Sequence, residues 1–340
     1  MIKLKLTFIA FICFQSVFSQ DVHFSQYYAS PLVLNPATTG MFDGDFRFNS
    51  CYKDQWRTIS NPYKTFFASA DAALLKGKWK NGFLGCGLAI LSDRAGAGSL
   101  GLTQINFSLS YSTFVNASNS LTAGLQLGYD QRSINYETLK WDNQFNGLAF
   151  DPSRGSGEQG LSDISFVDMS CGLLWNAQLN DRFKMNMGFS VAHLNKSNLS
   201  FYRINADTLK LRIIYHGSMN VSLNNSRGSL LPGWMIVKQG NSFEINVGGF
   251  VKYSFDRYYS GHTRSPAIYV GCFYRWKDAI ILAFRLDFRK NLTMGLSYDF
   301  TLSPLVNANR TLGGAELSLQ YVGLFSQEKK HQERCPEWVN

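Results

Sequence analysis

The sequence predicts an all-β fold, a transmembrane antiparallel β-barrel of about 14 strands of the outer-membrane type. The first observation is an alternation of apolar and polar residues, clearest between Ile105 and Asp130. A period of two residues places one set of side chains on each face of a strand. The second is that 45% of residues are hydrophobic and 15% aromatic, yet no apolar run of about 18 residues follows Ser19. The third is that similar alternating segments recur along the chain, as the lipid-facing residues of a barrel do.

The clearest pair of strands predicts an antiparallel hairpin. Apolar residues alternate with polar ones over 105–112 and again over 121–130, and the polar stretch Asn116–Asn119 lies between them. Each strand runs for about ten residues, which is what a tilted transmembrane strand needs. We expect the apolar set to face lipid and the polar set to face the lumen.

The first residues are predicted to be a cleavable secretory signal, residues 1–19. Two lysines precede the apolar stretch Leu6–Phe14, and small residues precede Gln20. Cleavage removes both lysines from a formal net charge of +9. The remaining excess suits an anionic outer-membrane lipid surface, and its lack of clustering indicates no nucleic-acid partner.

Three strand candidates precede the hairpin. Asp45–Gln55 places Phe46 and Phe48 on one face and Arg47 and Lys53 on the other. Tyr63–Leu74 alternates in the same way. Gly82–Leu91 carries Gly85 and Gly87 on one face, where a close approach or a strong bend is possible.

Nine more candidates follow the hairpin and bring the count to an even number, as a closed barrel requires. The ninth strand is the weakest because it contains Pro232. In the twelfth, Arg285, Asp287 and Arg289 oppose the apolar set, and a cation facing mid-membrane lipid costs ~2–4 kcal/mol, so these three must point inward. The nine candidates are 167–175, 183–191, 211–223, 230–237, 243–253, 268–276, 280–288, 292–300 and 317–321.

The connections divide the chain into parts with different roles. Connections on one side are mostly short, and those on the other, such as 132–163 and 195–209, are mostly long, as periplasmic turns and extracellular loops are. Two connections break this rule, 256–265 and 238–241, so either they are real exceptions or the ninth strand is misplaced. The predicted organisation is residues 1–19 signal peptide, 20–43 N-terminal periplasmic or plug-like segment, 44–325 β-barrel and 326–340 mobile periplasmic tail.

Several blocks resemble one family. Phe24–Tyr27, Leu34–Ala37 and Tyr52–Trp56 are similar to the entry segment and first strand of the PorP/SprF family of type IX secretion membrane proteins. Ser297–Ser303 followed by Gly313–Tyr321 resembles that family's closing hairpin.

The resemblance implies a non-enzymatic component of the type IX secretion and gliding machinery in Bacteroidota-like cells. Members are implicated in exporting or anchoring cargo with a C-terminal sorting domain, often a large surface adhesin. Some members instead associate with a periplasmic OmpA-like, peptidoglycan-binding partner. The sequence leaves these two roles open and assigns no partner-binding residue.

Two functions from other classes compete with this one. A barrel of this size could be a diffusion porin or solute channel unless it is plugged. A lipid hydrolase could use His216 and Ser218, which share a strand face. That face is the polar one, whereas a lipid hydrolase needs the pair to face lipid.

No catalytic, cofactor-binding or metal-binding residue is predicted. Asp142–Gly147 resembles half of a calcium loop, but Gln144 and Ser153 depart from the ligand pattern. The mature chain carries an odd number of widely spaced cysteines, which is no disulfide framework. These are Cys51, Cys86, Cys171, Cys272 and Cys335.

Overall fold

The computed structural model describes most of the chain. The predicted signal peptide 1–19 and the predicted tail 326–340 lie outside the described residues, as do residue 20, Arg289 and Cys335. The described residues are 21–57, 61–76, 78–79, 81–96, 98–157, 160–201, 208–223, 227–255, 266–288 and 291–325.

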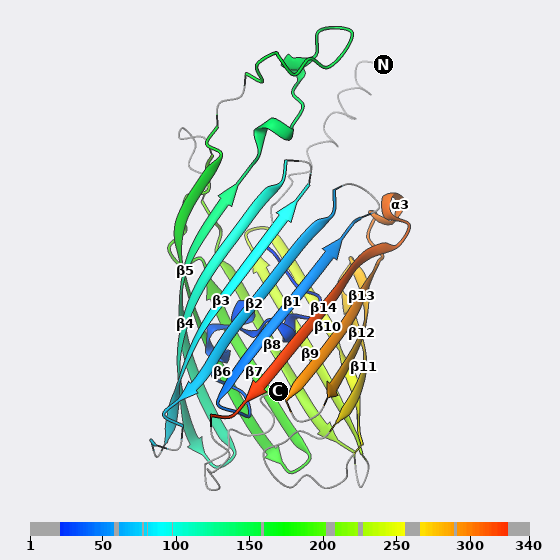
Figure 1. The fold of residues 1–340 in the computed structure, drawn as a ribbon. Coiled ribbons are helices and arrows are strands. Elements are labelled where there is room, and N and C mark those ends of the chain that lie inside the picture. Colours follow the sequence, from blue (N-terminus) through cyan, green and yellow to red (C-terminus); the bar gives the residue numbers. More distant parts are fainter. Residues whose placement is uncertain are drawn as a thin grey trace, which may run out of the picture.

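Fourteen antiparallel strands form one closed barrel (Figure 1). Each strand pairs with its neighbours in sequence, and the ring closes where β1 pairs with β14. Closure gives the backbone amides and carbonyls partners within the barrel, which a lipid environment demands. The fold class and strand number predicted from alternation are therefore confirmed. The strands are β1 (Phe46–Gln55), β2 (Tyr63–Leu74), β3 (Gly82–Ala95), β4 (Leu100–Asn116), β5 (Asn119–Ser133), β6 (Asp163–Asn180), β7 (Phe183–Ala192), β8 (Arg212–Ser222), β9 (Gly228–Gln239), β10 (Ser242–Ser254), β11 (Ala267–Arg275), β12 (Ala279–Phe288), β13 (Leu292–Thr301) and β14 (Leu312–Gly323).

Helical structure among the described residues is limited to short turns. None of these helices is long and apolar enough to span a membrane. They are η1 (Tyr27–Ala29), α2 (Pro31–Leu34), η2 (Pro36–Thr38), η3 (Tyr136–Thr138), η4 (Asp142–Gln144) and α3 (Val306–Asn309).

The two faces of the strands divide as alternation predicts. Leu125 in β5 is 67% exposed on the outer wall, whereas Ser108 and Ser112 in β4 are fully buried on the inner one. In β12, Asp287 is buried on the inner face and Phe284 is exposed. The outer surface is therefore an apolar wall, which faces lipid in a membrane barrel.

The ninth strand is real and longer than predicted. The register between β8 and β9 stops at the pair Ser218–Gly233 and resumes at Val221–Leu230, so the gap falls opposite Pro232. Proline has no amide hydrogen to donate to a ladder, which explains the local gap. With β9 in place, the short connection between β9 and β10 is real and consists of residues 240–241. The connection between β10 and β11 is long, and its residues 256–265 lie outside the described residues.

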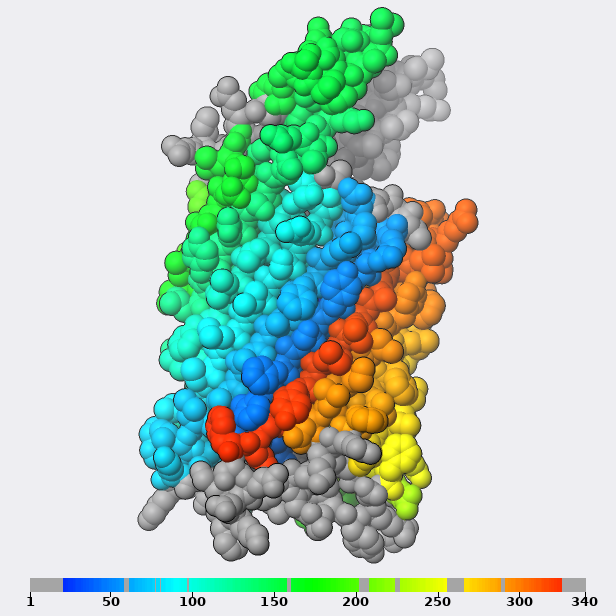
Figure 2. All heavy atoms as spheres, in the orientation of Figure 1, coloured from blue at the N-terminus to red at the C-terminus, as the bar shows by residue number. Residues whose placement is uncertain are grey.

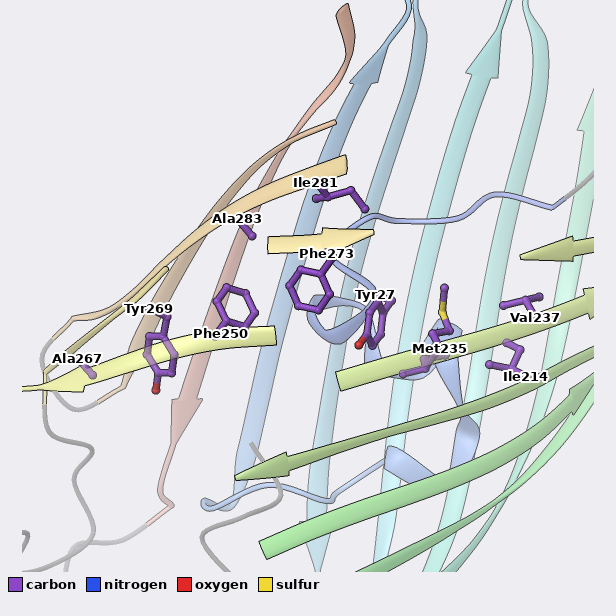
Figure 3. Packing of buried hydrophobic residues seen from close by; sticks show 11 residues of the cluster. Tyr27, Ile214, Met235, Val237, Phe250, Ala267, Tyr269, Phe273, Ile281 and Ala283 are labelled. Atoms are coloured by element: carbon purple, nitrogen blue, oxygen red, sulfur yellow. The ribbon is translucent and has the colours of Figure 1, made fainter. Parts of the chain in front are cut away.

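The inner wall is not polar all round, which corrects the expectation that only polar side chains line the lumen. Strands β8 to β12 turn a buried apolar cluster inward (Figure 3). Its members pack against Tyr27 and Leu34, which precede the barrel in sequence, so these side chains are covered by protein and not by water. The cluster includes Ile214, Met235, Val237, Phe250, Tyr269, Phe273 and Ile281.

The barrel rim is uneven. Strands β4 and β6 have 17 and 18 residues, whereas β11 and β12 have 9 and 10. Residues 134–157 project beyond the tall side, in green in Figure 2, and the strands from β11 onward end lower. We call this the long-loop end and the opposite end the short-turn end.

Candidate functional site

A segment inside the barrel is the main candidate for function. This lumen segment, Asp21–Gly44, runs from the long-loop end to the short-turn end and leads into β1 (blue in Figure 1). At the long-loop end Asp21 contacts residues at the ends of β5, β7 and β9. At the short-turn end, the Lys76 ammonium donates to the carbonyl of Gly44 at 3.2 Å. The segment therefore passes through the lumen.

Two prolines and an asparagine shape the middle of the lumen segment. Pro31 opens α2 and Pro36 opens η2, positions where the missing amide hydrogen costs nothing. The Asn35 side chain caps η2 by accepting from the amide of Ala37 at 2.9 Å. Its Nδ2 also donates to the carbonyl of Leu173 at 3.0 Å. Asn35 thus both forms the turn and fastens it to β6.

A buried ion pair binds the start of the lumen segment to β1 and β14, the two strands whose pairing closes the barrel. Lys53 of β1 lies 3.1 Å from Glu316 of β14, with side-chain exposures of 1% and 0%. The two oxygens of Glu316 accept from the amides of Ser25 and Gln26 at 2.7 and 2.8 Å. The Lys53 ammonium also donates to the carbonyl of His23 at 2.9 Å. Breaking such a buried pair costs about 3–5 kcal/mol because one charge is left uncompensated.

A second ionic cluster lies beside the first. Arg275 lies 2.8 Å from Asp299 and 2.6 Å from Asp278. It also donates to the hydroxyl of Ser25 at 3.0 Å, and that hydroxyl donates to Asp299 at 2.6 Å. Strands β11 and β13 therefore hold the same part of the lumen segment from another side.

The last part of the segment is fixed near the short-turn end. Arg47 of β1 forms a bidentate pair with Asp71 of β2, with donor–acceptor distances of 3.0 and 2.8 Å. Asp71 also accepts from the amide of Gly40 at 2.8 Å, and Arg47 donates to the carbonyl of Thr38 at 3.1 Å. Both charges thus bind the segment as well as each other.

A histidine between two carboxylates holds the entrance of the segment. The ring of His193, which follows β7, lies 2.6 Å from Asp21 and 3.0 Å from Asp168. Burial alone would lower the pKa of His193, but its hydrogen bonds to Asp168 and Asp21 raise that pKa to about 9. Burial alone would raise the pKa of Asp21, but His193, Arg212 and Arg132 hold it well below its usual value. The entrance is therefore tied by a charged pair at neutral pH.

Glycines on the inner wall let the lumen segment approach the strands. A Cβ added at Gly85 of β3 would lie 2.3 Å from the carbonyl oxygen of Thr39, and one at Gly124 of β5 would lie 2.4 Å from the amide of Ala37. Neither position accepts a side chain without moving backbone. The predicted close approach at Gly85 is confirmed.

A cavity of about 160 Å³ lies between the lumen segment and the inner wall, lined mainly by β6 to β12 with Arg47 of β1 and Gln320 of β14. On the apolar side of the cavity, the ring of Tyr28 stacks on that of Phe273, with centroids 5.9 Å apart, and meets the ring of Phe250 edge-on, with centroids 5.2 Å apart. Asn186 and Ser218 line its polar side. The cavity has a mixed surface and adjoins the apolar cluster of Figure 3.

The His216 and Ser218 pair lies on this inner wall, not on the lipid-facing one. His216 is 4% exposed, and its Nε2 lies 3.1 Å from the side-chain nitrogen of Asn35. The hydroxyl of Ser218 accepts from Asn186 at 2.8 Å. Both side chains are therefore engaged by the lumen segment or the wall.

The loop that resembles half of a calcium site forms local turns. Asp142–Gln144 is the short helix η4, and Asp151 accepts from the amide and the hydroxyl of Ser153 at 3.0 and 2.6 Å. The described residues contain no group of three or more His, Cys, Asp or Glu side chains that could hold a metal ion.

Sequence reasoning did not find the contacts that hold the lumen segment. Alternation places Lys53 inward, but it does not say that Glu316 lies beside it, since the pairing follows from ring closure. One sequence feature could have indicated these contacts: charged residues of both signs, such as Lys53 and Glu316, occupy inward-facing positions on strands that are distant in sequence.

Comparison with known proteins identifies the family. No curated protein matches the chain. The family described as type IX secretion system membrane protein PorP/SprF matches residues 16–321. The chain belongs to this family.

This PorP/SprF-family protein also resembles solved barrels at low identity. The Pseudomonas putida toluene transporter TodX is 12% identical, with a TM-score of 0.49, over 89% of this chain and 97% of that one. A Pseudomonas aeruginosa FadL homologue is 11% identical, with a TM-score of 0.45, over 90% and 95%. The CymD monoaromatic hydrocarbon channel is 12% identical, with a TM-score of 0.45, over 86% and 92%. The hydrocarbons in these names belong to those channels.

Proposed function

We propose that this outer-membrane barrel is a non-enzymatic docking component of type IX secretion. In this proposal the long-loop end faces the outside and holds secreted or surface-anchored cargo, such as an adhesin with a C-terminal sorting domain. The family membership supports the secretion role. Docking needs surface complementarity and no catalytic group.

The lumen segment carries this proposal. It is held by side chains of β1, β2, β11, β13 and β14 and by residues at the ends of other strands. A segment tied from so many sides favours a closed platform over an open pore. The long loops then form the surface that a partner can reach.

The rival functions have less support. A diffusion porin needs a free lumen, and here the lumen segment occupies it. A lipid hydrolase needs His216 and Ser218 at the lipid face, and they lie on the inner wall.

The partner could also lie at the short-turn end, as a periplasmic OmpA-like, peptidoglycan-binding protein. Affinity purification of the tagged barrel from its own membrane distinguishes this role from cargo docking. Recovery of a sorting-domain protein supports docking, and recovery of a peptidoglycan-binding protein alone supports the periplasmic role.

Deletion of the gene tests the proposal directly. We expect the deletion to abolish surface display of one or more adhesins, measured by antibody labelling of intact cells. Restoring the gene on a plasmid should restore display. Unchanged display of all sorting-domain cargo in the deletion strain would contradict the docking role.

A further inference from the structure

A second cavity opens at the long-loop end, on the side of the barrel where the shorter strands from β11 onward end. This mouth pocket, of about 330 Å³, lies where β1, β11 and β13 end and where β10, β12 and β14 begin. It differs from the cavity near Tyr28, which lies deeper in the barrel. Its charged lining residues are Glu244, Arg275, Asp278 and Asp299.

The charges of the mouth pocket do not balance. Arg275 is the cation of the pocket, and Asp278 and Asp299 already bind it. Glu244 pairs with no lysine or arginine among the described residues, and its nearest ion-pair contact is His23 at 3.9 Å. Two aspartates bind one arginine, so the pocket carries an excess of negative charge.

Buried polar atoms in and beside the pocket lack hydrogen-bond partners in the described part of the chain. Asp299 is 1% exposed, and its Oδ1 has no hydrogen-bond partner in the described part of the chain. Oε1 of Glu244 is also buried without one. Asn246 is fully buried two residues further along β10, next to Arg275 in the register, and both its amide atoms lack partners. Buried polar groups are normally hydrogen-bonded, so the unpartnered carboxyl oxygens of Asp299 and Glu244 indicate a ligand that supplies donors.

Aromatic side chains flank the carboxylates. Trp56, Trp276 and Phe243 line the same pocket. Trp56 has a left-handed backbone, with φ at +56°, a conformation that residues other than glycine rarely adopt. Its amide donates to Gly313 at 3.0 Å, and its ring meets Tyr63 edge-on at 4.9 Å. These contacts hold the indole at the mouth, and aromatic faces attract cations.

We propose that the mouth pocket binds an arginine side chain of a polypeptide docked at the long-loop end. A guanidinium presents five donors in a plane and can meet acceptors that point from different directions. It can also stack on an indole. The identity of the occupant as a polypeptide rests on the proposed docking function, whereas the preference for a guanidinium rests on the pocket.

Binding to the purified full-length barrel tests this inference. The probe is a fluorescent, end-blocked peptide Gly-Gly-Arg-Gly-Gly, followed by fluorescence anisotropy. The matched control peptide carries citrulline, which has nearly the same shape and no charge. We expect the arginine peptide to bind about tenfold more tightly than the citrulline peptide at low salt. Equal binding of the two peptides, or no binding of the arginine peptide, overturns the inference.

Two variants locate the site. Glu244→Gln should weaken binding of the arginine peptide about tenfold, whereas Glu137→Gln, the same change on the exposed loop, should leave it unchanged. Where Glu244→Gln fails to fold, as judged by heat-dependent migration on a gel, Asp278→Asn replaces it, since that side chain is 44% exposed. Unchanged binding to the folded pocket variant refutes the site.

The outcomes separate this inference from the docking proposal. Where gene deletion abolishes adhesin display but Glu244→Gln binds the peptide like the wild type, the pocket assignment fails and docking stands. Where display survives deletion but arginine binding depends on Glu244, docking fails and the pocket stands.

Discussion

Lys53 illustrates which properties of a single residue follow from the sequence and which follow from the fold. Its position in an alternating strand predicts that it points inward, and the structure places it 1% exposed beside Glu316. The charge on an inner wall is stable only because a carboxylate and the His23 carbonyl meet it. The alternation predicted the face, and the partners came from the fold.

Neighbouring residues of β5 test the assignment of faces. Leu125 is 67% exposed on the lipid-facing wall, near the middle of its strand. Gln126 faces inward and donates to the carbonyl of Leu32 at 3.1 Å and to Ser108 at 2.8 Å. Leu125→Arg should cost ~2–4 kcal/mol in unfolding free energy in lipid vesicles. Gln126→Arg keeps a polar side chain on the inner wall and loses two hydrogen bonds, each worth about 0.5–1.5 kcal/mol, so it should cost less than Leu125→Arg. Equal effects in urea titrations would mean that the faces are wrongly assigned.

At the scale of elements, the lumen segment decides the character of the barrel. It has little alternation, and its prolines and Asn35 form turns in place of a strand. Its burial explains why β8 to β12 carry apolar side chains inward, around Tyr27 and Leu34. The wall and the segment therefore form one shared core.

The entrance of the lumen segment should respond to pH. Because pairing raises the pKa of His193 from 6.5 to about 9, its contribution to stability is complete below about 6.5 and is lost as pH rises through about 9. The lowered pKa of Asp21 adds stability above 3.8, which is lost as pH falls toward its folded-state value. We expect the urea midpoint of the barrel to fall as pH rises from about 6.5 to about 9 and to lose nothing further from His193 above that.

His193→Gln is the control for this pH dependence. It removes the titrating ring, so the variant should start less stable and lose less on going to high pH. A wild-type midpoint that falls no more than that of the variant between about pH 6.5 and 9 would rule out a charged His193.

At the scale of the whole molecule, the barrel should be closed to ions. A barrel of fourteen strands is wide enough to conduct unless it is filled. Single-channel recording of the intact protein should show no large, stable conductance. A large conductance would favour the porin.

A glycine variant tests whether the lumen segment provides the closure. In Gly124→Leu the new side chain meets backbone of Pro36 and Ala37, so the segment must move and conductance should appear. The matched control is Gly128→Leu on the same strand and face, where the nearest atom is the side-chain oxygen of Asn106. Conductance that appears equally in both variants would contradict this role of the segment.

Local alternation was enough to predict the barrel and the faces of most strands, because a membrane imposes that period on each strand separately. The family was recognised from its motifs, which are also local in sequence. Which charged side chains pair, where the apolar part of the inner wall lies and how the mouth pocket forms became known from the tertiary structure alone. Those features join residues such as Ser25 and Glu316, which are distant in sequence and meet only because the ring closes around the segment that precedes it.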